Sequence, residues 1–354
     1  MKRQKIKVAV VGATGAVGRE LLRLMEERGL DAELVAVLAS SRSSGRQISF
    51  RGQTLLVQNL DQFDFATVDM AFFSAGSSVS HIHARRAAAS GVLVIDNTNA
   101  FRMDAATPLL VPQVNPQELR QRPRTNIISN PNCSTIPVVR LLAPVQQVNP
   151  IASVIACTYQ AASGAGLTGL AELDISAREA LENSCVAPYH ERFVVPLGYN
   201  VVPSIDVLED DGFTLEERKM GQESRKILSA PNLHVSATCV RVPVRNCHSA
   251  AVYVRCERPI ESMALKVLWR AAPEIQVYEG HDAADFPSPR LIGSSDLVHV
   301  GRIRQDPEDP TAFWFWVVSD NIRVGAALNA VQIAETLLAE RHFDLHNSGS
   351  PILA

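Results

Sequence analysis

The chain has 354 residues, a length that predicts about two domains. Apolar residues make up 46% of it and charged residues 20%, as is typical of a globular protein with a sizeable core. The 34 basic and 37 acidic side chains leave a formal net charge of −3 without a basic tract, so neither a nucleic acid nor a membrane is an expected partner. No apolar run reaches the roughly 18 residues of a membrane helix and no signal peptide is evident, so we expect a cytoplasmic protein.

The first third of the chain alternates short apolar runs with helical patterns. Strands are predicted at residues 6–11, 34–38, 68–73, 92–95 and 127–128. A helix follows the first strand and ends at Gly29, and an alanine-rich helix spans residues 77–89. This alternation predicts a parallel sheet with helices on both faces, the doubly wound Rossmann-type fold.

A glycine-rich turn joins the first predicted strand to the first predicted helix. It carries Gly12, Gly15 and Gly18. Glycine allows a tight turn and a close approach of the backbone to a pyrophosphate, which then lies at the positive end of the helix. Because the turn stands directly between strand and helix, a dinucleotide site is favoured over a plain tight turn.

The end of the second predicted strand indicates which dinucleotide is bound. NAD enzymes usually carry an acidic residue there for the ribose 2′-hydroxyl. Residues 39–46 instead offer serines together with Arg42 and Arg46, and a guanidinium suits a 2′-phosphate. We therefore expect NADP(H), with a solvated loop as the alternative interpretation.

The sequence changes character after residue 150. Segments rich in β-formers at 153–159, 235–244, 251–256 and 313–318 predict a mixed α+β domain. Polar stretches near 196–213 and 279–295 are predicted as long surface connections, and residues 325–341 as a helix.

Six cysteines are too few for a disulfide scaffold in a chain of this length, and without a Cys-x-x-Cys pair no metal site is expected. Cys133 stands apart because it follows a strand and opens a helical pattern, where the helix dipole favours a thiolate. Cys247 is predicted as a packed strand residue, with oxidation as the less favoured alternative. The other four, predicted to lie in the core, are Cys157, Cys185, Cys239 and Cys256.

Several long motifs resemble the aspartate-β-semialdehyde dehydrogenase family, nearly from end to end of the chain. They are GATGAVG, SRS, NAFRM, NPNCST, YQAASGAG, TLEERKMGQESRKIL, TCVRVPV, HS, SDN and GAALNAVQIAE. The resemblance implies an NADPH-dependent reductive dephosphorylation of L-4-aspartyl phosphate to L-aspartate 4-semialdehyde. That reaction leads towards lysine, diaminopimelate, threonine and methionine.

The resemblance also implies a role for each matching residue. Cys133 would be the nucleophile that forms an acyl-thioester, His248 the acid/base, and Gln160 the residue that orients the substrate and the acyl intermediate. Arg241 would bind the α-carboxylate of the substrate and Glu216 its ammonium. These charges complement those of the substrate, and a thiolate is strongly nucleophilic near neutral pH.

Further matching positions would hold the phosphate and the cofactor. Arg102 and Lys219 would bind the phosphate that is released. The expected cofactor-binding residues are Gly12, Thr14, Gly15, Ala16, Val17, Arg42, Ser43, Ser163, Gly164 and Asn321. The resemblance further implies a homodimer, and it leaves open whether dimers pair into tetramers.

The expected fold is a Rossmann-type NADP-binding domain at residues 1–132 plus 321–354. Residues 133–320 would form a central α+β catalytic and dimerisation domain similar to the C-terminal domain of glyceraldehyde-3-phosphate dehydrogenase. The sequence departs from the family pattern at a few positions without removing a group that has an assigned role. Asn246-Cys247 stands where a glycine commonly precedes the histidine, and the other departures are Ala250, Val324 and Pro137.

Three alternative interpretations remain at this point. N-acetyl-γ-glutamyl-phosphate reductase shares the fold plan and the cysteine chemistry, but its substrate has no ammonium for Glu216 to bind. A glyceraldehyde-3-phosphate dehydrogenase-like enzyme fits the motifs less well. A catalytically impaired paralogue that acts as a binding protein should have lost Cys133 or His248, and this chain keeps both.

Overall fold

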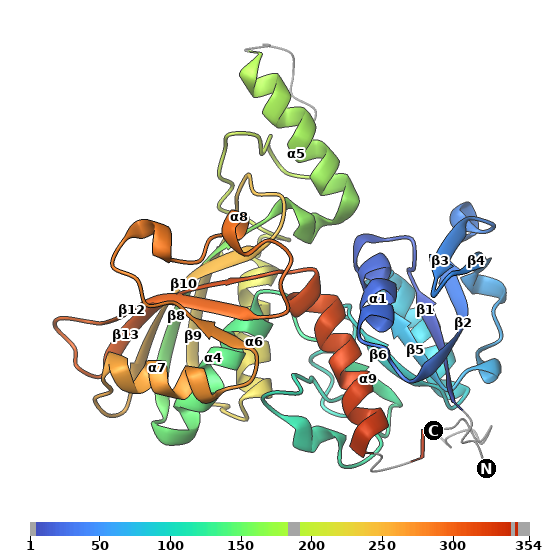
Figure 1. Cartoon of the computed structure of the whole chain (residues 1–354), viewed down its shortest axis with the longest axis horizontal. Helices are drawn as coiled ribbons and strands as arrows, with labels where there is room; N and C mark the ends of the chain where they lie inside the picture. The colour runs from blue at the N-terminus through green and yellow to red at the C-terminus, as the bar shows by residue number, and fades with distance from the viewer. Residues whose placement is uncertain (1–4, 183–191, 341–343, 346–354) are drawn as a thin grey trace. The chain divides into compact units, whose positions relative to one another are not determined.

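The structure is a computed structural model that describes residues 5–182, 192–340 and 344–345 (Figure 1). The chain divides into two compact units. The first comprises Met1–Pro131 together with Ala326–Ala354, and the second comprises Asn132–Gly325.

A seven-stranded sheet with the strand order β3-β4-β2-β1-β5-β6-β7 forms the centre of the first unit. Neighbouring strands are parallel except for the antiparallel β3–β4 pair at one edge. Every residue of β5 and β6 is buried, as expected of parallel strands covered on both faces. The strands are β1 (Ile6–Val11), β2 (Ala32–Ala39), β3 (Gln47–Phe50), β4 (Gln53–Asn59), β5 (Met70–Phe73), β6 (Leu93–Asp96) and β7 (Ile127–Ser129).

The strand order changes direction at β1, which pairs with β2 on one side and β5 on the other. In doubly wound sheets, ligands bind at the carboxyl ends of the strands at such a switch point. The turn that follows β1 therefore occupies the place where a dinucleotide would bind. The helices of this unit are α1 (Ala16–Glu27), α2 (Ser77–Val79), α3 (Arg85–Ala89) and α9 (Leu328–Glu340).

The second unit contains a six-stranded mixed sheet with the order β11-β12-β13-β10-β8-β9. Helices α4, α6 and α7 pack on one of its faces (Figure 1). The strands are β8 (Ile151–Gln160), β9 (His234–Arg241), β10 (His248–Cys256), β11 (Ile275–Val277), β12 (Val298–Gln305) and β13 (Ala312–Ser319). The helices are α4 (Thr135–Val148), α5 (Gly166–Leu181), α6 (Leu215–Ile227), α7 (Ser262–Ala271) and α8 (Pro289–Ile292).

The opposite face of this sheet is more open. Along β8 the residues alternate, so that Ile155 and Tyr159 are exposed while their neighbours are buried. Aromatic side chains continue the face across the sheet, where Tyr159 packs against Trp316 and Tyr253 against Trp314. The second sheet thus carries an apolar surface on the side away from α4, α6 and α7.

The predicted fold class is confirmed, and so is the first strand, which has the predicted bounds. The predicted helix over residues 77–89 was wrong in detail, because a π-helical turn at Ser80–Ala84 separates α2 from α3. The predicted strand over residues 235–244 ends early at Arg241, since Pro243 has no backbone N–H to donate to a ladder. Helices α5, α6 and α7 and strands β3, β4, β11 and β12 were not predicted.

Two other predictions also need correction. The connection 196–213 is not purely a surface segment, because Leu197, Val202 and Ile205 are buried. The connection 279–295 contains the short helix α8. Among the described residues, no helix is long and apolar enough to cross a membrane.

Candidate active site

Cys133 is the second residue of the second unit and directly precedes Ser134, the N-cap of α4. Asn132 shapes this helix end, since its side-chain Oδ1 accepts the Ser134 N–H at 2.8 Å and its carbonyl accepts the Thr135 N–H at 3.0 Å. Gly325 packs against the cysteine, because a Cβ built on it would fall 2.7 Å from the Cβ of Cys133. Cys133 is half-buried, and the positive end of a helix favours its thiolate form.

A cavity of about 410 Å³ opens beside Cys133 within the second unit. Its walls come from the start of α4, the end of β8, α6, β9 and the connection that follows α5. Five of the residues predicted from the sequence line it together with Cys133. They are Gln160, Gly164, Glu216, Lys219 and Arg241.

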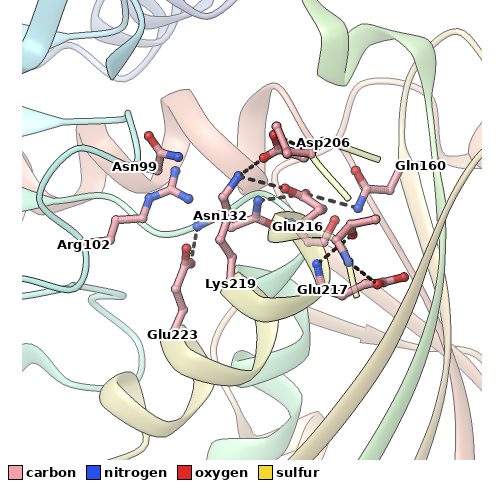
Figure 2. Close-up of polar contacts among 12 residues, drawn as sticks. Asn99, Arg102, Asn132, Gln160, Asp206, Glu216, Glu217, Lys219 and Glu223 are labelled. Carbon is pink, nitrogen blue, oxygen red and sulfur yellow. Dashed lines mark hydrogen bonds and ion pairs between the residues drawn. The ribbon is translucent and has the colours of Figure 1, made fainter. Parts of the chain in front are cut away.

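Glu216 is the centre of the polar network in this cavity (Figure 2). Its Oε1 accepts hydrogen bonds from Asn132 Nδ2 at 2.9 Å and from Gln160 Nε2 at 3.3 Å. Its Oε2 lies 3.4 Å from the ammonium of Lys219, which also pairs with Asp206. Although burial raises the pKa of Asp206, the bond to Lys219 holds it below its usual value. The cavity therefore combines two carboxylates with a cation between them.

Arg241 brings a second cation to the cavity from the end of β9. Its side chain is buried, its Nη1 donates to the carbonyl of Ala161 at 2.7 Å, and the Phe193 ring centroid lies 5.8 Å from its guanidinium carbon. Burial lowers the pKa of Arg241 below its usual value, although the negative charge of the nearby Glu216 acts in the opposite direction. A buried guanidinium held this way is suited to a carboxylate ligand.

His248 is the first residue of β10, and its side chain lies next to Gly164. A Cβ on Gly164 would come within 3.2 Å of His248 Nε2 and 3.0 Å of Arg241 Nη1, so only glycine fits there without displacing them. The backbone N–H of Ala161 donates to His248 Nδ1 at 3.0 Å. Burial and the charge of Arg241 lower the pKa of His248 well below 6.5, so the ring is neutral near pH 7.

The hydrogen bond at Nδ1 fixes the tautomer of this neutral ring. A nitrogen that accepts a hydrogen bond carries no proton, so the ring proton of His248 must be on Nε2. Among the described residues, Nε2 makes no hydrogen bond although it is buried. His248 can therefore donate a hydrogen bond through Nε2 in its resting state.

The other cysteines differ from Cys133 in burial and acidity. Burial raises the thiol pKa of Cys239 and of Cys247 to about 12 and that of Cys256 to about 11, so all three stay protonated. The prediction that Cys157 lies in the core was wrong, because it is half-buried on the open face of β8. Cys185 lies outside the described residues.

The prediction that Cys247 is a strand residue was wrong. It lies in the turn before β10 with a φ of +72°, and its thiol donates to the carbonyl of Gly293 at 3.1 Å. Its backbone N–H donates to Asn321 Oδ1 at 3.0 Å, while Asn321 Nδ2 donates to Ser163 Oγ at 2.9 Å. Ser163 and Asn321 are thus buried in a network that holds the turn leading to His248.

The other predicted residues belong to the first unit. Gly12 has a φ of +84°, and a Cβ there would come within 2.8 Å of the Ser74 backbone. A Cβ on Gly18 would fall 2.1 Å from the Gly12 carbonyl oxygen, whereas one on Gly15 would meet nothing closer than 3.4 Å. These contacts match the three glycine roles of a dinucleotide turn, with the backbone at Gly15 open to a ligand. Thr14, Ala16 and Val17 are half-buried in the same turn.

Arg42 and Arg102 also lie in the first unit, in different surroundings. Arg42 is exposed in the 3-10 turn Ser41–Ser43 that follows β2, beside the half-buried Ser43. Arg102 is buried, and its guanidinium donates to the carbonyls of Asn130 at 2.9 Å and Asn97 at 3.0 Å.

Some residues of the cavity were not identified from the sequence. Asn132 adjoins Cys133 in the NPNCST motif, so its position next to the nucleophile was a usable signal. Asp206, Arg192 and Phe193 line the cavity from a connection whose sequence carries no comparable signal. Within the described part of the chain, no three His, Cys, Asp or Glu side chains are grouped so that they could hold a metal ion.

Family models match both parts of the chain. Residues 7–122 match the semialdehyde dehydrogenase NAD binding domain, and residues 142–324 match the semialdehyde dehydrogenase dimerisation domain. Fold, cavity and matches together define a nicotinamide-dependent oxidoreductase of the semialdehyde dehydrogenase class.

Individual relatives narrow the class. Aspartate-semialdehyde dehydrogenase of Bacillus subtilis (strain 168) is 42% identical over 339 residues, which cover 94% of this chain and 97% of that protein. The crystal structure of aspartate semialdehyde dehydrogenase II from Vibrio cholerae, complexed with ASA, superposes with a TM-score of 0.92 at 41% identity over 96% of this chain and 99% of that one. The enzyme from Candida albicans, solved with NADP, has a TM-score of 0.74 at 26% identity over 96% and 100% of the two chains. The chain belongs to the aspartate-semialdehyde dehydrogenase family.

Proposed function

We propose that this protein reduces L-4-aspartyl phosphate to L-aspartate 4-semialdehyde and phosphate with NADPH, through a thioester on Cys133. The observation that carries the proposal is the single cavity that groups Cys133 with Gln160, Glu216, Lys219 and Arg241. The substrate has an ammonium, a carboxylate and an acyl phosphate, and this wall offers a group of matching charge for each. The reaction would serve lysine, diaminopimelate, threonine and methionine biosynthesis.

The charged side chains bind and orient the substrate. Glu216 accepts the ammonium, and Arg241 pairs with the α-carboxylate through its guanidinium. Lys219, already between Glu216 and Asp206, binds the phosphate together with Arg102. The relative from Vibrio cholerae, solved with ASA, supports a substrate of this kind.

In the first stage, the Cys133 thiolate attacks the acyl carbon. A carbon–sulfur bond forms and the bond to the phosphate oxygen breaks, so that phosphate leaves with its charge neutralised by the two cations. Gln160 donates from its amide to hold the acyl group. His248 donates a hydrogen bond from Nε2 to the oxygen that becomes negative in the tetrahedral intermediate.

In the second stage, a bound NADPH would supply the hydride that reduces the thioester carbon. His248 again donates a hydrogen bond from Nε2 to the developing alkoxide and keeps its proton, because the collapse of this alkoxide to the aldehyde needs none. The carbon–sulfur bond then breaks, which releases the aldehyde and returns Cys133 as a thiolate. Neutral His248 thus serves as a hydrogen-bond donor to the oxyanion in each tetrahedral stage.

The residues of the glycine turn and its surroundings fit this cofactor. The open backbone at Gly15, with Gly12 and Gly18 excluding side chains nearby, suits a pyrophosphate at the N-terminus of α1. The exposed Arg42 suits the 2′-phosphate. The residues proposed to hold NADPH are Gly12, Thr14, Gly15, Ala16, Val17, Arg42, Ser43, Ser163, Gly164 and Asn321.

The same proposal covers domains and assembly. Residues 1–132 plus 321–354 bind the cofactor, and residues 133–320 carry catalysis and dimerisation in a cytoplasmic enzyme. The apolar open face of the second sheet, which exposes Ile155 and Tyr159, supports a homodimer through this domain. Pairing of such dimers into a tetramer is the further step to be measured by the mass of the particle in solution.

The decisive experiment compares two aldehydes in the oxidative direction with phosphate and NADP. We expect turnover with L-aspartate 4-semialdehyde and little with N-acetylglutamate semialdehyde, because Glu216 selects an ammonium. Cys133→Ala should abolish turnover. Preference for the acetylated aldehyde would overturn the substrate assignment, and near-normal turnover of Cys133→Ala would overturn the thioester.

A further inference from the structure

A buried carboxylate on α6 has no part in the reaction described so far. Glu216, Lys219 and Glu223 follow one another at positions i, i+3 and i+7, so they share one face of this helix. Glu216 and Lys219 line the cavity, whereas Glu223 is buried with 2% of its surface exposed. Carboxylates are rarely buried to this extent unless a partner satisfies them.

One hydrogen bond of Glu223 comes from the backbone beside the nucleophile. Its Oε2 accepts the N–H of Asn132 at 2.6 Å, as Figure 2 shows. A hydrogen bond to a charged acceptor is roughly twice as strong as a neutral one. Asn132 directly precedes Cys133, so this bond acts one residue away from the reacting sulfur.

Asn132 is held from α6 at two points. Its side-chain Nδ2 donates to Glu216 at 2.9 Å, and its N–H donates to Glu223. Both carboxylates project from α6. This one helix therefore positions both Glu216, which would bind the ammonium, and the backbone next to the nucleophile. A shift of about 1 Å in such a constellation can cost about a hundredfold in rate.

We propose that Glu223 is a positioning residue, which fixes the backbone of Asn132–Cys133 and places a negative charge beside the nucleophile. The proposal rests on the proposed function, in which Cys133 attacks a substrate held by Glu216. The backbone bond sets where the sulfur stands relative to the acyl carbon. The charge opposes ionisation of the thiol, and a less acidic thiol is the better nucleophile once it is ionised.

Two substitutions separate position from charge. Glu223→Gln keeps the shape and an amide oxygen that can accept the Asn132 N–H, but it removes the charge. Glu223→Ala removes the acceptor altogether. Glu217→Gln is the matched control, because Glu217 lies on the same helix and its Oε1 accepts a backbone N–H at 2.9 Å, from Cys239.

Turnover of L-aspartate 4-semialdehyde and the pH dependence of Cys133 alkylation by iodoacetamide are the two readouts. We expect Glu223→Ala to lower kcat about 10- to 100-fold while KM changes less than about threefold. Glu223→Gln should keep most of kcat and move the alkylation midpoint to lower pH. Glu217→Gln should change neither.

An unmoved alkylation midpoint in Glu223→Gln overturns the proposal, and this measurement stands even if Glu223→Ala does not fold. A folded Glu223→Ala with unchanged kcat, or an equal loss of kcat in Glu217→Gln, also overturns it. Failure of the proposed function is recognised separately, by turnover in Cys133→Ala. The alkylation measurement needs no substrate and therefore does not depend on the substrate assignment.

Discussion

Substitutions at Cys247 test whether the backbone is strained next to His248. Its φ of +72° places it in the left-handed region, which a residue with a Cβ occupies at a cost of about 1–2 kcal/mol. This φ value would suit a glycine, which has no Cβ. The pair Cys247→Gly and Cys247→Ala isolates the strain, since both variants lose the same thiol and its bond to Gly293.

The expected difference between the two variants follows from two opposing terms. Glycine relieves the strain of about 1–2 kcal/mol, but it adds conformational entropy to the unfolded chain worth about 0.4–1 kcal/mol. Cys247→Gly should therefore have a free energy of unfolding about 1 kcal/mol above that of Cys247→Ala. Urea denaturation of the two variants measures this difference.

A second pair at Cys256 serves as the control. Cys256 is also buried, but it lies in β10 without a positive φ. Here Cys256→Ala should be the more stable variant by about 0.5–1 kcal/mol, since glycine loses more backbone entropy than alanine when it is fixed in an extended conformation. If alanine is at least as stable as glycine at both positions, the strain argument for Cys247 is refuted.

Three further predictions concern the cofactor and His248. Arg42→Ala should raise the KM for NADPH at least about tenfold and leave NADH nearly unchanged, because one charge-assisted phosphate contact is lost; equal losses would contradict the 2′-phosphate role. His248→Asn keeps an acceptor for the Ala161 N–H but has no donor at the position of Nε2, so its kcat should fall about 10²- to 10⁴-fold. His248→Gln can place an N–H at that position and should retain more activity. If His248→Asn were the more active variant, the assigned tautomer would be refuted. Because the pKa of His248 lies well below 6.5 in the folded chain, the unfolded chain binds more protons below pH 6.5, and stability should decrease from pH 7 to pH 5 by at most about 1.4 kcal/mol per unit for this one group. His248→Gln should flatten that slope in urea titrations, and an unchanged slope would contradict a buried neutral ring.

The parts of the molecule that could be predicted are those where local chemistry is enough. Gly12 has a positive φ, and a Cβ on Gly18 would clash with the Gly12 carbonyl, so both glycines follow from the local geometry of the turn. Cys133 could be singled out because a helix start follows it in the sequence. For β1 the nearly continuous apolar run was enough to predict the bounds, since all of its residues but Lys7 are apolar and buried.

Other features depend on contacts between segments far apart in sequence. Helix α6 has few apolar positions and was missed, although Thr214 and Glu217 form a capping box that marks its start. Cys157 and Cys239 could not be distinguished from sequence, because the strand register sets which face each one occupies. The bond from Glu223 to Asn132 joins residues 91 positions apart, and no spacing rule predicts it.

In this site, the groups that favour the thiolate of Cys133 differ from the group that donates a hydrogen bond to the oxyanion, which is His248. If His248 had to take the thiol proton through Nε2, that nitrogen would have to be free of a proton, and the ring proton would move to Nδ1, where it would face the Ala161 N–H. Two donors would then oppose each other in a buried site, which costs about 1–3 kcal/mol for the unsatisfied group. The ionisation of Cys133 is therefore better explained by the N-terminus of α4 and the cations of the cavity, and Glu223 limits how far that ionisation is favoured. In this arrangement His248 stays neutral and donates a hydrogen bond from Nε2 to the oxygen of the tetrahedral intermediate.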